Sequence, residues 1–119
     1  MNQGIIVFGH GSRLASANDA VRAVAARAAA AGRWTLWETA FLEADPRLSH
    51  AIEKLLAAGA ASILITPYFL TLGMHLERDL PALVLEAQRQ FSIPIRVTPP
   101  LDGHEALSRI LVERAEAAG

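Results

Sequence analysis

Four short apolar runs, each followed by a stretch with helical spacing, constrain the fold of this 119-residue chain more than any other feature. The first run, residues 4–9, reads Gly-Ile-Ile-Val-Phe-Gly and is rich in β-branched residues, which is typical of a strand buried on both faces. The other runs cover residues 34–41, 61–66 and 93–97. This alternation predicts a single α/β domain over residues 1–119, with three layers, in which an open parallel sheet of about four strands lies between helices on both faces.

Helix signals lie between the apolar runs, where this fold requires them. Ser16 and Asp45 are candidate N-caps of the first two helices, and Asp102 is the candidate for the last. Pro81 opens the helical pattern that precedes the fourth run. Apolar residues at helical spacing indicate the buried face of each helix. In the last helix they are Ala106, Leu107, Ile110 and Leu111.

Composition excludes several classes of protein. The 11 basic and 12 acidic residues give a net charge of −1, so the chain lacks the concentrated positive charge that nucleic acid binding requires. There is no cysteine, which excludes disulfides and thiolate metal sites and is compatible with a reducing compartment. No apolar run reaches the ~18 residues of a membrane-spanning helix, and the N-terminus lacks a signal-peptide pattern. We therefore expect a soluble, cytoplasmic protein that binds neither nucleic acid nor membranes.

Three polar residues that are common in metal sites follow the first three runs, one after each. His10 follows the first run, Glu43 the second and His75 the third, at separations of 33 and 32 residues. In parallel sheets the carboxyl ends of the strands meet at one edge, and ligands bind there at the point where the strand order reverses. With the flavodoxin-like strand order 2-1-3-4, this point lies between the first and third strands. We therefore expect His10 and His75 on opposite sides of one crevice, with Glu43 nearby.

Two imidazoles and a carboxylate suit a divalent first-row metal ion such as Co²⁺, Fe²⁺, Ni²⁺ or Zn²⁺. A neutral histidine binds metal through a ring nitrogen, and a carboxylate in a partly apolar crevice accepts protons. The spacing alone leaves a second interpretation open, in which His10 and His75 are solvated or helix-capping residues. His50 and His104 fall within predicted helices, where we expect both on the surface.

The segment after the third run also carries three large apolar residues, Leu70, Leu72 and Met74. Two interpretations of these residues are open. They are either packing residues of the core or an apolar wall for a flat ligand, because ligand pockets combine apolar walls with a few polar groups.

Three motifs, one after each of the first three runs, resemble those of one family. They are Gly-His-Gly-Ser-Arg at residues 9–13, Phe-Leu-Glu at residues 41–43 followed by Pro46, and Pro-Tyr-Phe-Leu at residues 67–70 with Gly-x-His at 73–75 and Asp-Leu-Pro at 79–81. This set resembles the small class II sirohydrochlorin chelatases of the CbiX/SirB type, from about residue 4 to the final helix. The His-Gly-Ser piece alone is a weak signal, and the third motif is the most specific.

The resemblance implies an activity and a set of roles. The activity is the insertion of Co²⁺ or Fe²⁺ into sirohydrochlorin, on the way to cobalamin or sirohaem, and related members use Ni²⁺. In that family the residues that correspond to His10 and His75 bind the metal, and the acid that corresponds to Glu43 assists. The metal is then a substrate, and no permanent cofactor is expected. Longer members carry two such halves in one chain, so the resemblance implies that this short chain works as a homodimer.

The tetrapyrrole that the resemblance implies carries many carboxylates on its rim. Basic groups and hydroxyls bind such carboxylates, and the candidates are Ser12, Arg13 and Arg78. A solvated or helix-capping role is an equally open interpretation for each of them.

Two other functions use the same residues. A metal or tetrapyrrole carrier without enzymatic activity needs the same histidines but tolerates the loss of Glu43, whereas catalysed proton removal does not. Phosphohistidine chemistry at His10 needs an arginine immediately before it, where the sequence has Gly9. The sequence leaves open which metal is used and which tetrapyrrole pathway surrounds the protein.

Overall fold

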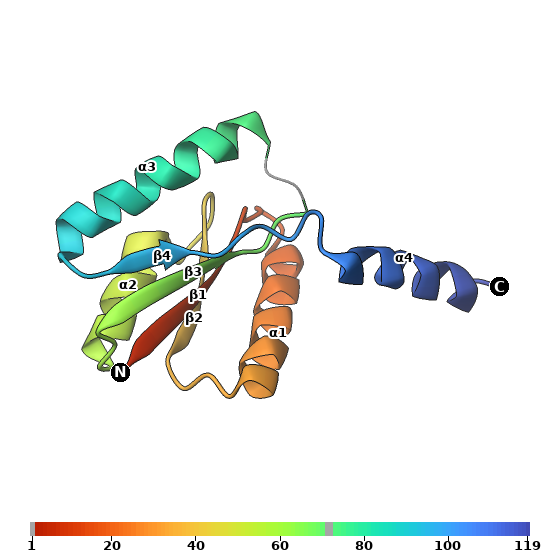
Figure 1. The fold of residues 1–119 in the computed structure, drawn as a ribbon, viewed down its shortest axis with the longest axis horizontal. Helices are drawn as coiled ribbons and strands as arrows, with labels where there is room; N and C mark the ends of the chain where they lie inside the picture. The colour runs from red at the N-terminus through yellow and green to blue at the C-terminus, as the bar shows by residue number, and fades with distance from the viewer. Residues whose placement is uncertain (1, 71–72) are drawn as a thin grey trace.

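The computed structural model describes residues 2–70 and 73–119, with residues 74 and 75 described by their backbone only. Four strands alternate with four helices along the chain (Figure 1). The elements are β1 (Gln3–Gly9), α1 (Ala15–Gly32), β2 (Trp37–Phe41), α2 (Leu48–Ala57), β3 (Ser62–Pro67), α3 (Met74–Phe91), β4 (Ile95–Val97) and α4 (Glu105–Ala117). Among the described residues, no helix combines the length and the hydropathy that a membrane span needs.

The four strands form one parallel sheet in the order β2-β1-β3-β4. β1 lies between its two neighbours, so that Ile5 is opposite both Trp37 of β2 and Leu64 of β3. β4 is a short edge strand that pairs with β3 from Ile95 onwards. The predicted α/β class, the parallel sheet and the strand order 2-1-3-4 are therefore confirmed.

One face of the sheet forms the core with α2 and α3. Side chains alternate along β3, so Ile63 and Ile65 are buried in this core whereas Leu64 lies on the other face. Ile6 and Phe8 of β1 enter the same core. The helix residues of the core are Leu48, Ala51, Ile52, Leu55, Leu80, Val84 and Ala87. Because burying one such aliphatic side chain stabilises a fold by roughly 1.5–3 kcal/mol, this layer holds the strands in place.

α1 packs on the opposite face of the sheet. Its buried residues are Ala25 and Ala29, whose small side chains allow the helix to approach the strands closely. A Cβ atom placed on Gly9 would lie 3.6 Å from Cγ1 of Val21, so α1 passes over the end of β1. On the same face, Leu64 of β3 is only half-buried, which shows that α1 does not cover the whole sheet.

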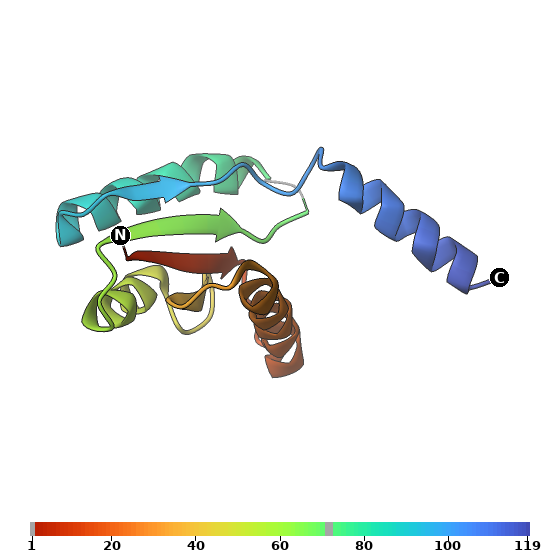
Figure 2. The ribbon, with the colours of Figure 1, turned by 60° about the horizontal axis from the view of Figure 1, so that its bottom comes forward.

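α4 extends away from the rest of the molecule, as two views show (Figure 1, Figure 2). The projecting helix contributes to the elongated dimensions of 52 × 33 × 27 Å. None of the residues of α4, all of which the structure describes, is buried. The sequence predicted a buried face that includes Ile110 and Leu111. In the single chain this prediction is wrong, because the link after β4 directs the helix away from the sheet.

The first two helices begin at other residues than the sequence predicted. The N-cap of α1 is Leu14, two residues before Ser16, and the N-cap of α2 is Arg47, two residues after Asp45. Neither residue makes a side-chain cap hydrogen bond. Contacts of the preceding loops, described below, override the capping preference and set where each helix starts.

The last two helices also begin elsewhere. α3 starts at Met74 and contains Pro81, so the prediction that Pro81 opens this helix is wrong. Pro81 is exposed, and the missing backbone hydrogen bond is tolerated because the buried side of the same helix packs against the sheet. α4 starts after His104 rather than Asp102, since Nδ1 of His104 accepts a hydrogen bond from the backbone N–H of Ala106 at 3.0 Å.

Candidate metal-binding site

His10 directly follows β1 and is exposed at the carboxyl edge of the sheet. Its Nδ1 lies 3.1 Å from the carbonyl oxygen of Gly11. Because a carbonyl oxygen only accepts hydrogen bonds, this contact requires the proton on Nδ1. In the neutral ring Nε2 then carries the lone pair, so Nε2 is the atom that His10 offers to a metal ion.

The loop after His10 is closed by hydrogen bonds with the first turn of α1. The backbone N–H of Ser12 donates to Oδ1 of Asn18 at 2.9 Å, and Nδ2 of Asn18 donates to the carbonyl oxygen of Ser12 at 2.8 Å. The hydroxyl oxygen of Ser12 accepts from the backbone N–H of Leu14 at 3.0 Å. These bonds explain why α1 begins before Ser16. The sequence pattern did not single out Asn18, because its partner becomes visible only once the loop is folded.

Glu43 lies beside His10 because the pairing of β1 with β2 continues beyond the two strands. The backbone N–H of Leu42 donates to the carbonyl oxygen of Gly9 at 3.0 Å, and that of Glu43 donates to the carbonyl oxygen of His10 at 2.8 Å. The side chains of His10 and Glu43 are both exposed. The structure thus brings two of the three predicted site residues, an imidazole and a carboxylate, to the ends of adjacent strands.

Gly11 allows these two loops to approach each other. Its φ angle is +88°, which is the left-handed region that favours glycine. A Cβ atom at this position would lie 3.0 Å from both Cβ and the backbone nitrogen of Ala44, and 3.0 Å from Cβ of Phe41. The close contact between the loops after β1 and β2 therefore depends on a residue without a side chain.

Two arginines hold the segment that carries Glu43. Arg22 of α1 donates from Nη2 to the carbonyl oxygen of Asp45 at 3.3 Å. Arg47, the N-cap of α2, donates from Nη1 to the carbonyl oxygen of Leu42 at 2.9 Å. The sequence pattern did not identify either arginine, since the partner of each is a backbone oxygen that carries no sequence signal.

The segment after β3 rises from the same edge. The backbone N–H of Tyr68 donates to the carbonyl oxygen of Phe8 at 2.7 Å, and the ring of Phe69 meets that of Phe8 edge to face with 6.1 Å between centroids. His75 is the second residue of α3, which follows this segment. Its backbone therefore lies in the first turn of the helix, and its side chain is outside the described part of the structure.

Large apolar side chains are exposed around this edge. Leu70 is 70% exposed, so its interpretation as a core packing residue is wrong, and its role in an apolar wall stays a prediction. Leu72 and the side chain of Met74 lie outside the described residues. Leu14, after β1, and Tyr68, after β3, are also exposed; the sequence analysis named Tyr68 only as part of a motif and did not single out Leu14. Exposed apolar side chains that follow adjacent strands are typical of a surface that a ligand covers.

The predicted polar contacts lie in the loop after β1 and in α3. Arg13 is exposed, and Ser12 retains its O–H as a donor after its oxygen has accepted the loop hydrogen bond. Nε of Arg78 lies 3.6 Å from Oδ1 of Asp79. Among the side chains that the structure describes, no three from histidine, aspartate and glutamate group to hold a metal ion, and His75 is not one of those side chains.

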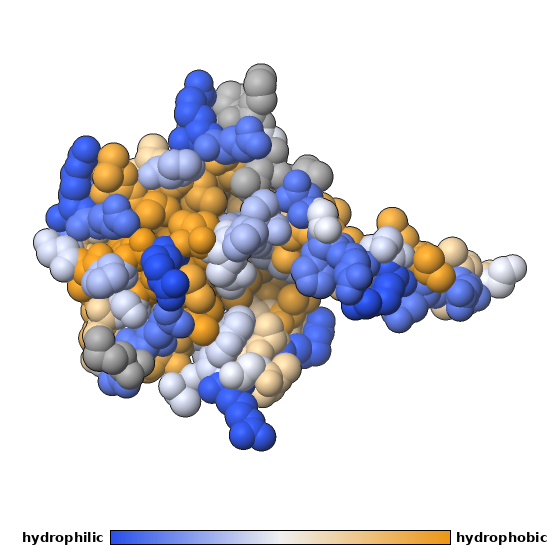
Figure 3. Space-filling view, in the orientation of Figure 1, coloured by the Kyte–Doolittle hydropathy of each residue, from blue (hydrophilic) through white to orange (hydrophobic). Residues whose placement is uncertain are grey.

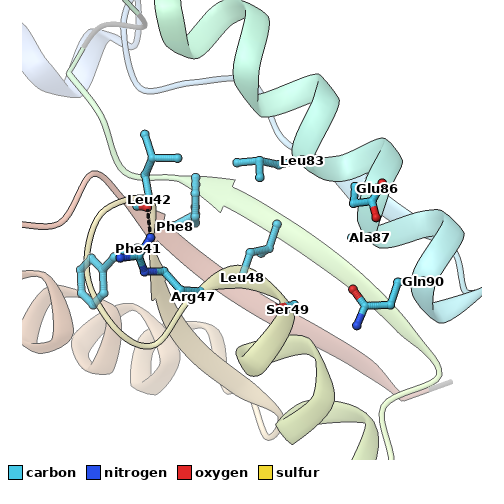
Figure 4. A pocket seen from close by; sticks show the side chains of 10 residues that line it. All are labelled: Phe8, Phe41, Leu42, Arg47, Leu48, Ser49, Leu83, Glu86, Ala87 and Gln90. Atoms are coloured by element: carbon cyan, nitrogen blue, oxygen red, sulfur yellow. Dashed lines mark hydrogen bonds between the residues drawn. The ribbon is translucent and has the colours of Figure 1, made fainter.

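A cavity of about 240 Å³ lies beside this edge, between the start of α2 and α3 (Figure 4). Its lining residues are Phe8, Phe41, Leu42, Arg47, Leu48, Ser49, Leu83, Glu86, Ala87 and Gln90. Pockets for drug-sized ligands measure roughly 300–1,000 Å³, so this cavity is too small to enclose a large macrocycle.

A model of the CbiX family matches residues 4–118. The chain belongs to the CbiX family. It is 34% identical over 83 residues to a sirohydrochlorin cobaltochelatase of Methanococcus maripaludis, with 69% of this chain and 58% of that protein covered. It is 30% identical over 122 residues to the sirohydrochlorin cobaltochelatase of Methanococcoides burtonii, with 94% of this chain and 93% of that protein covered. The family that the three motifs predicted is therefore confirmed.

The fold of this CbiX chain also matches solved structures. The sirohydrochlorin chelatase SirB from Bacillus subtilis subspecies spizizenii, in complex with cobalt, gives a TM-score of 0.90 at 27% identity, with 98% of this chain and 51% of SirB covered. SirB from Bacillus subtilis with Fe³⁺ gives a TM-score of 0.90 at 25% identity, with 100% of this chain and 48% of SirB covered. The chain thus spans about half the length of SirB, and 58% of the Methanococcus maripaludis protein is matched.

Replacement of Gly11 by alanine should destabilise the loop that carries His10. A side chain at a φ of +88° and 3.0 Å from Ala44 and Phe41 strains the backbone, and we expect the free energy of unfolding in urea to fall by roughly 1–3 kcal/mol. Gly73→Ala is the matched control, since no atom of the described residues lies within 4 Å of its added Cβ and the φ angle is −70°. Equal losses of stability in the two variants would contradict the role given to Gly11.

Proposed function

We propose that this protein inserts Co²⁺ or Fe²⁺ into sirohydrochlorin, as a step toward cobalamin or sirohaem. The observation that carries the proposal is the CbiX family match over residues 4–118, which includes all three motifs. The relatives are named as sirohydrochlorin cobaltochelatases, and SirB has been solved with cobalt and with Fe³⁺. Ni²⁺ is a further metal that such a ligand set accepts.

His10 and His75 are the proposed metal ligands. The hydrogen bond from Nδ1 of His10 to the carbonyl oxygen of Gly11 leaves Nε2 for the incoming ion. His75 supplies the second imidazole from the first turn of α3, which follows the strand next to β1. Both residues act on the ion before it enters the ring, so the ion is a substrate of the reaction.

Glu43 is the proposed proton acceptor. A divalent ion that enters the ring displaces two pyrrole protons, so the net charge of the macrocycle does not change. The backbone hydrogen bond of 2.8 Å holds Glu43 next to His10, and in this proposal the Glu43 carboxylate accepts the two protons one at a time. Its exposed side chain then releases each proton to water.

The open edge is the proposed position of the tetrapyrrole. The flat ring is proposed to lie against the exposed side chains of Leu14, Tyr68 and Leu70. The same proposal assigns Leu72 and Met74 to this apolar wall. Ser12, Arg13 and Arg78 are proposed to bind the carboxylates on the rim of the ring. These contacts place the ring nitrogens over His10 and Glu43.

A homodimer is the proposed working form of the enzyme. The chain corresponds to about half of SirB, so two copies supply the length of one SirB chain. The exposed apolar side of α4 supports association, because a projecting helix gains stability when a partner covers that side.

Purified protein should accelerate the loss of the absorbance spectrum of metal-free sirohydrochlorin with Co²⁺ or Fe²⁺ under anaerobic conditions, relative to a control without enzyme. We expect His10→Ala and His75→Ala each to lower the rate at least tenfold. Loss of a residue that only hydrogen-bonds to a metal ligand typically lowers activity about 10- to 100-fold, and loss of the ligand itself should cost no less. His50→Ala, at an exposed position of α2, is the matched control. Wild-type rates in the His10 and His75 variants would refute the proposed ligands.

Glu43→Gln should lower turnover while metal affinity changes little. Glutamine has nearly the same shape as glutamate and keeps the backbone hydrogen bond of residue 43, but its amide does not act as a base. General base catalysis is worth roughly 10²–10⁴-fold in rate, so we expect a loss of turnover of that order. Rates from the absorbance assay and affinities from Co²⁺ titrations give the two quantities. Unchanged turnover in this variant would contradict the role of Glu43 as the proton acceptor, whereas the absence of turnover in the unmodified protein, despite tight binding of metal or tetrapyrrole, would support a carrier.

The protein should sediment at micromolar concentration with twice the 12.8 kDa mass of the chain. Sedimentation velocity over a range of protein concentrations measures this directly. A monomer throughout that range would contradict the homodimer and would leave the proposed chemistry of the edge untouched.

A further inference from the structure

The hydrogen bond that fixes the ring of His10 ends on a peptide unit that a second side chain also holds. Nδ1 of His10 donates to the carbonyl oxygen of Gly11 at 3.1 Å. This carbonyl belongs to the same peptide unit as the backbone N–H of Ser12, which donates to Oδ1 of Asn18 at 2.9 Å. Because a peptide unit is planar and trans, its C=O and N–H point in opposite directions. His10 and Asn18 therefore bind the two ends of one rigid group.

Asn18 holds both peptide units that flank Ser12. Its Nδ2 donates to the carbonyl oxygen of Ser12 at 2.8 Å, so its amide group contacts a donor and an acceptor of the same residue. The side chain is half-buried in the first turn of α1, a helix that packs on the sheet through Ala25 and Ala29. Asn18 thus ties the orientation of the loop after β1 to the position of the helix.

The peptide unit before Gly11 is held by a different element. The carbonyl oxygen of His10 accepts from the backbone N–H of Glu43, in the loop after β2, at 2.8 Å. Gly11 lies between the two held peptide units with a φ angle of +88°, and a glycine adds little restraint of its own. The orientation of the Gly11 carbonyl therefore depends on Asn18 more than on the local backbone.

Apolar packing does not supply the same restraint. The hydrophobic residues of the molecule gather on and around the sheet, as the space-filling view shows (Figure 3). In the loop after β1, none of residues 10–14, all of which the structure describes, is buried, and Leu14 is 65% exposed. This loop therefore takes its shape from hydrogen bonds.

The orientation of the Gly11 carbonyl decides which ring nitrogen of His10 carries the proton. A carbonyl oxygen that faces Nδ1 keeps the proton there and leaves the lone pair of the neutral ring on Nε2. The bond to Asn18 also polarises the peptide unit, since connected hydrogen bonds strengthen one another. In metal sites, a group that accepts a hydrogen bond from a histidine ligand fixes the ring and raises its basicity.

We propose that Asn18 is a positioning residue for the metal ligand His10. It acts through the peptide unit between Gly11 and Ser12, keeps the ring proton on Nδ1 and so directs Nε2 to the ion. The inference rests on the proposed role of His10 as a ligand. It gives the first turn of α1 a part in metal binding, although Asn18 itself does not touch the ion.

The tautomer of His10 tests this proposal without metal or tetrapyrrole. Protein labelled with ¹⁵N-histidine is studied by NMR at about pH 8.5, where free histidine is neutral. His10→Ala identifies the signals of His10 among those of the four histidines. We expect the form with the proton on Nδ1 to predominate in the unmodified protein. In Asn18→Ala its ratio to the form protonated on Nε2 should fall at least about threefold, as the loss of one hydrogen bond predicts.

Further variants separate this effect from a general loss of structure, and circular dichroism checks that each of them folds. Ser16→Ala, at an exposed position in the same turn, should leave the tautomer ratio within about twofold. Asn18→Leu keeps the shape of the side chain without its polar atoms and takes the place of Asn18→Ala if that variant does not fold.

Asn18→Asp is the conservative variant. Its carboxylate still accepts from the backbone N–H of Ser12, and the start of a helix favours a negative charge, so the tautomer ratio should stay within about twofold of that in the unmodified protein. The same ratio in Asn18→Asp as in Asn18→Ala would contradict the role given to the Ser12 N–H.

Co²⁺ titrations connect the tautomer to metal binding. The dissociation constant should rise about tenfold in Asn18→Ala, at the lower end of the 10- to 100-fold loss that is typical of groups behind a metal ligand. In Ser16→Ala it should stay within about twofold.

Three results would overturn the proposal. The first is a proton on Nε2 of His10 in most of the unmodified protein. The second is an unchanged tautomer ratio in Asn18→Ala, and the third is a changed ratio with unchanged Co²⁺ affinity. A protein that inserts no metal into sirohydrochlorin would refute the proposed function and leave the tautomer results as they are, so the two failures are distinguishable.

Discussion

Three loops of the candidate site are held by backbone hydrogen bonds that involve β1, and the rest of the site depends on them. On one side, the amides of Leu42 and Glu43 donate to the carbonyl oxygens of Gly9 and His10. On the other side, the amide of Tyr68 donates to Phe8. Because these donors and acceptors belong to the backbone, they do not depend on the side chains of the edge, apart from Gly11, where a side chain would push the two loops apart. The chemistry is then supplied by a few side chains on a fixed frame.

The parts of the fold that follow from hydrophobic patterning were predictable from the sequence. The runs at residues 4–9 and 61–66 gave the central strands, and their burial on two faces required a parallel sheet. The helix starts were not predictable in the same way. α1 begins where Ser12 and Asn18 exchange hydrogen bonds, a contact that exists only in the folded loop. α3 includes Pro81 because tertiary packing outweighs one lost backbone bond.

In the candidate site, too, some features were predictable from the sequence and others were not. The juxtaposition of His10 and Glu43 followed from topology, since residues after adjacent parallel strands meet at one edge. The supporting residues did not follow from the sequence. Arg22 and Arg47 bind backbone oxygens, and Gly11 is needed because the neighbouring loop passes within 3.0 Å of its missing Cβ. Such requirements depend on distances between segments, which composition and spacing do not contain.

If His10 binds the metal as proposed, the single hydrogen bond between the His10 ring and the Gly11 carbonyl has a consequence for how the ion would leave the protein. It commits one ring nitrogen to the backbone and leaves one donor atom, on a residue open to water. Structural zinc sites retain their ions because four protein ligands enclose them. An ion held by few protein donors keeps labile water molecules on its remaining positions. Four nitrogens of a macrocycle can replace those waters one after another, so weak retention by the protein favours transfer of the ion.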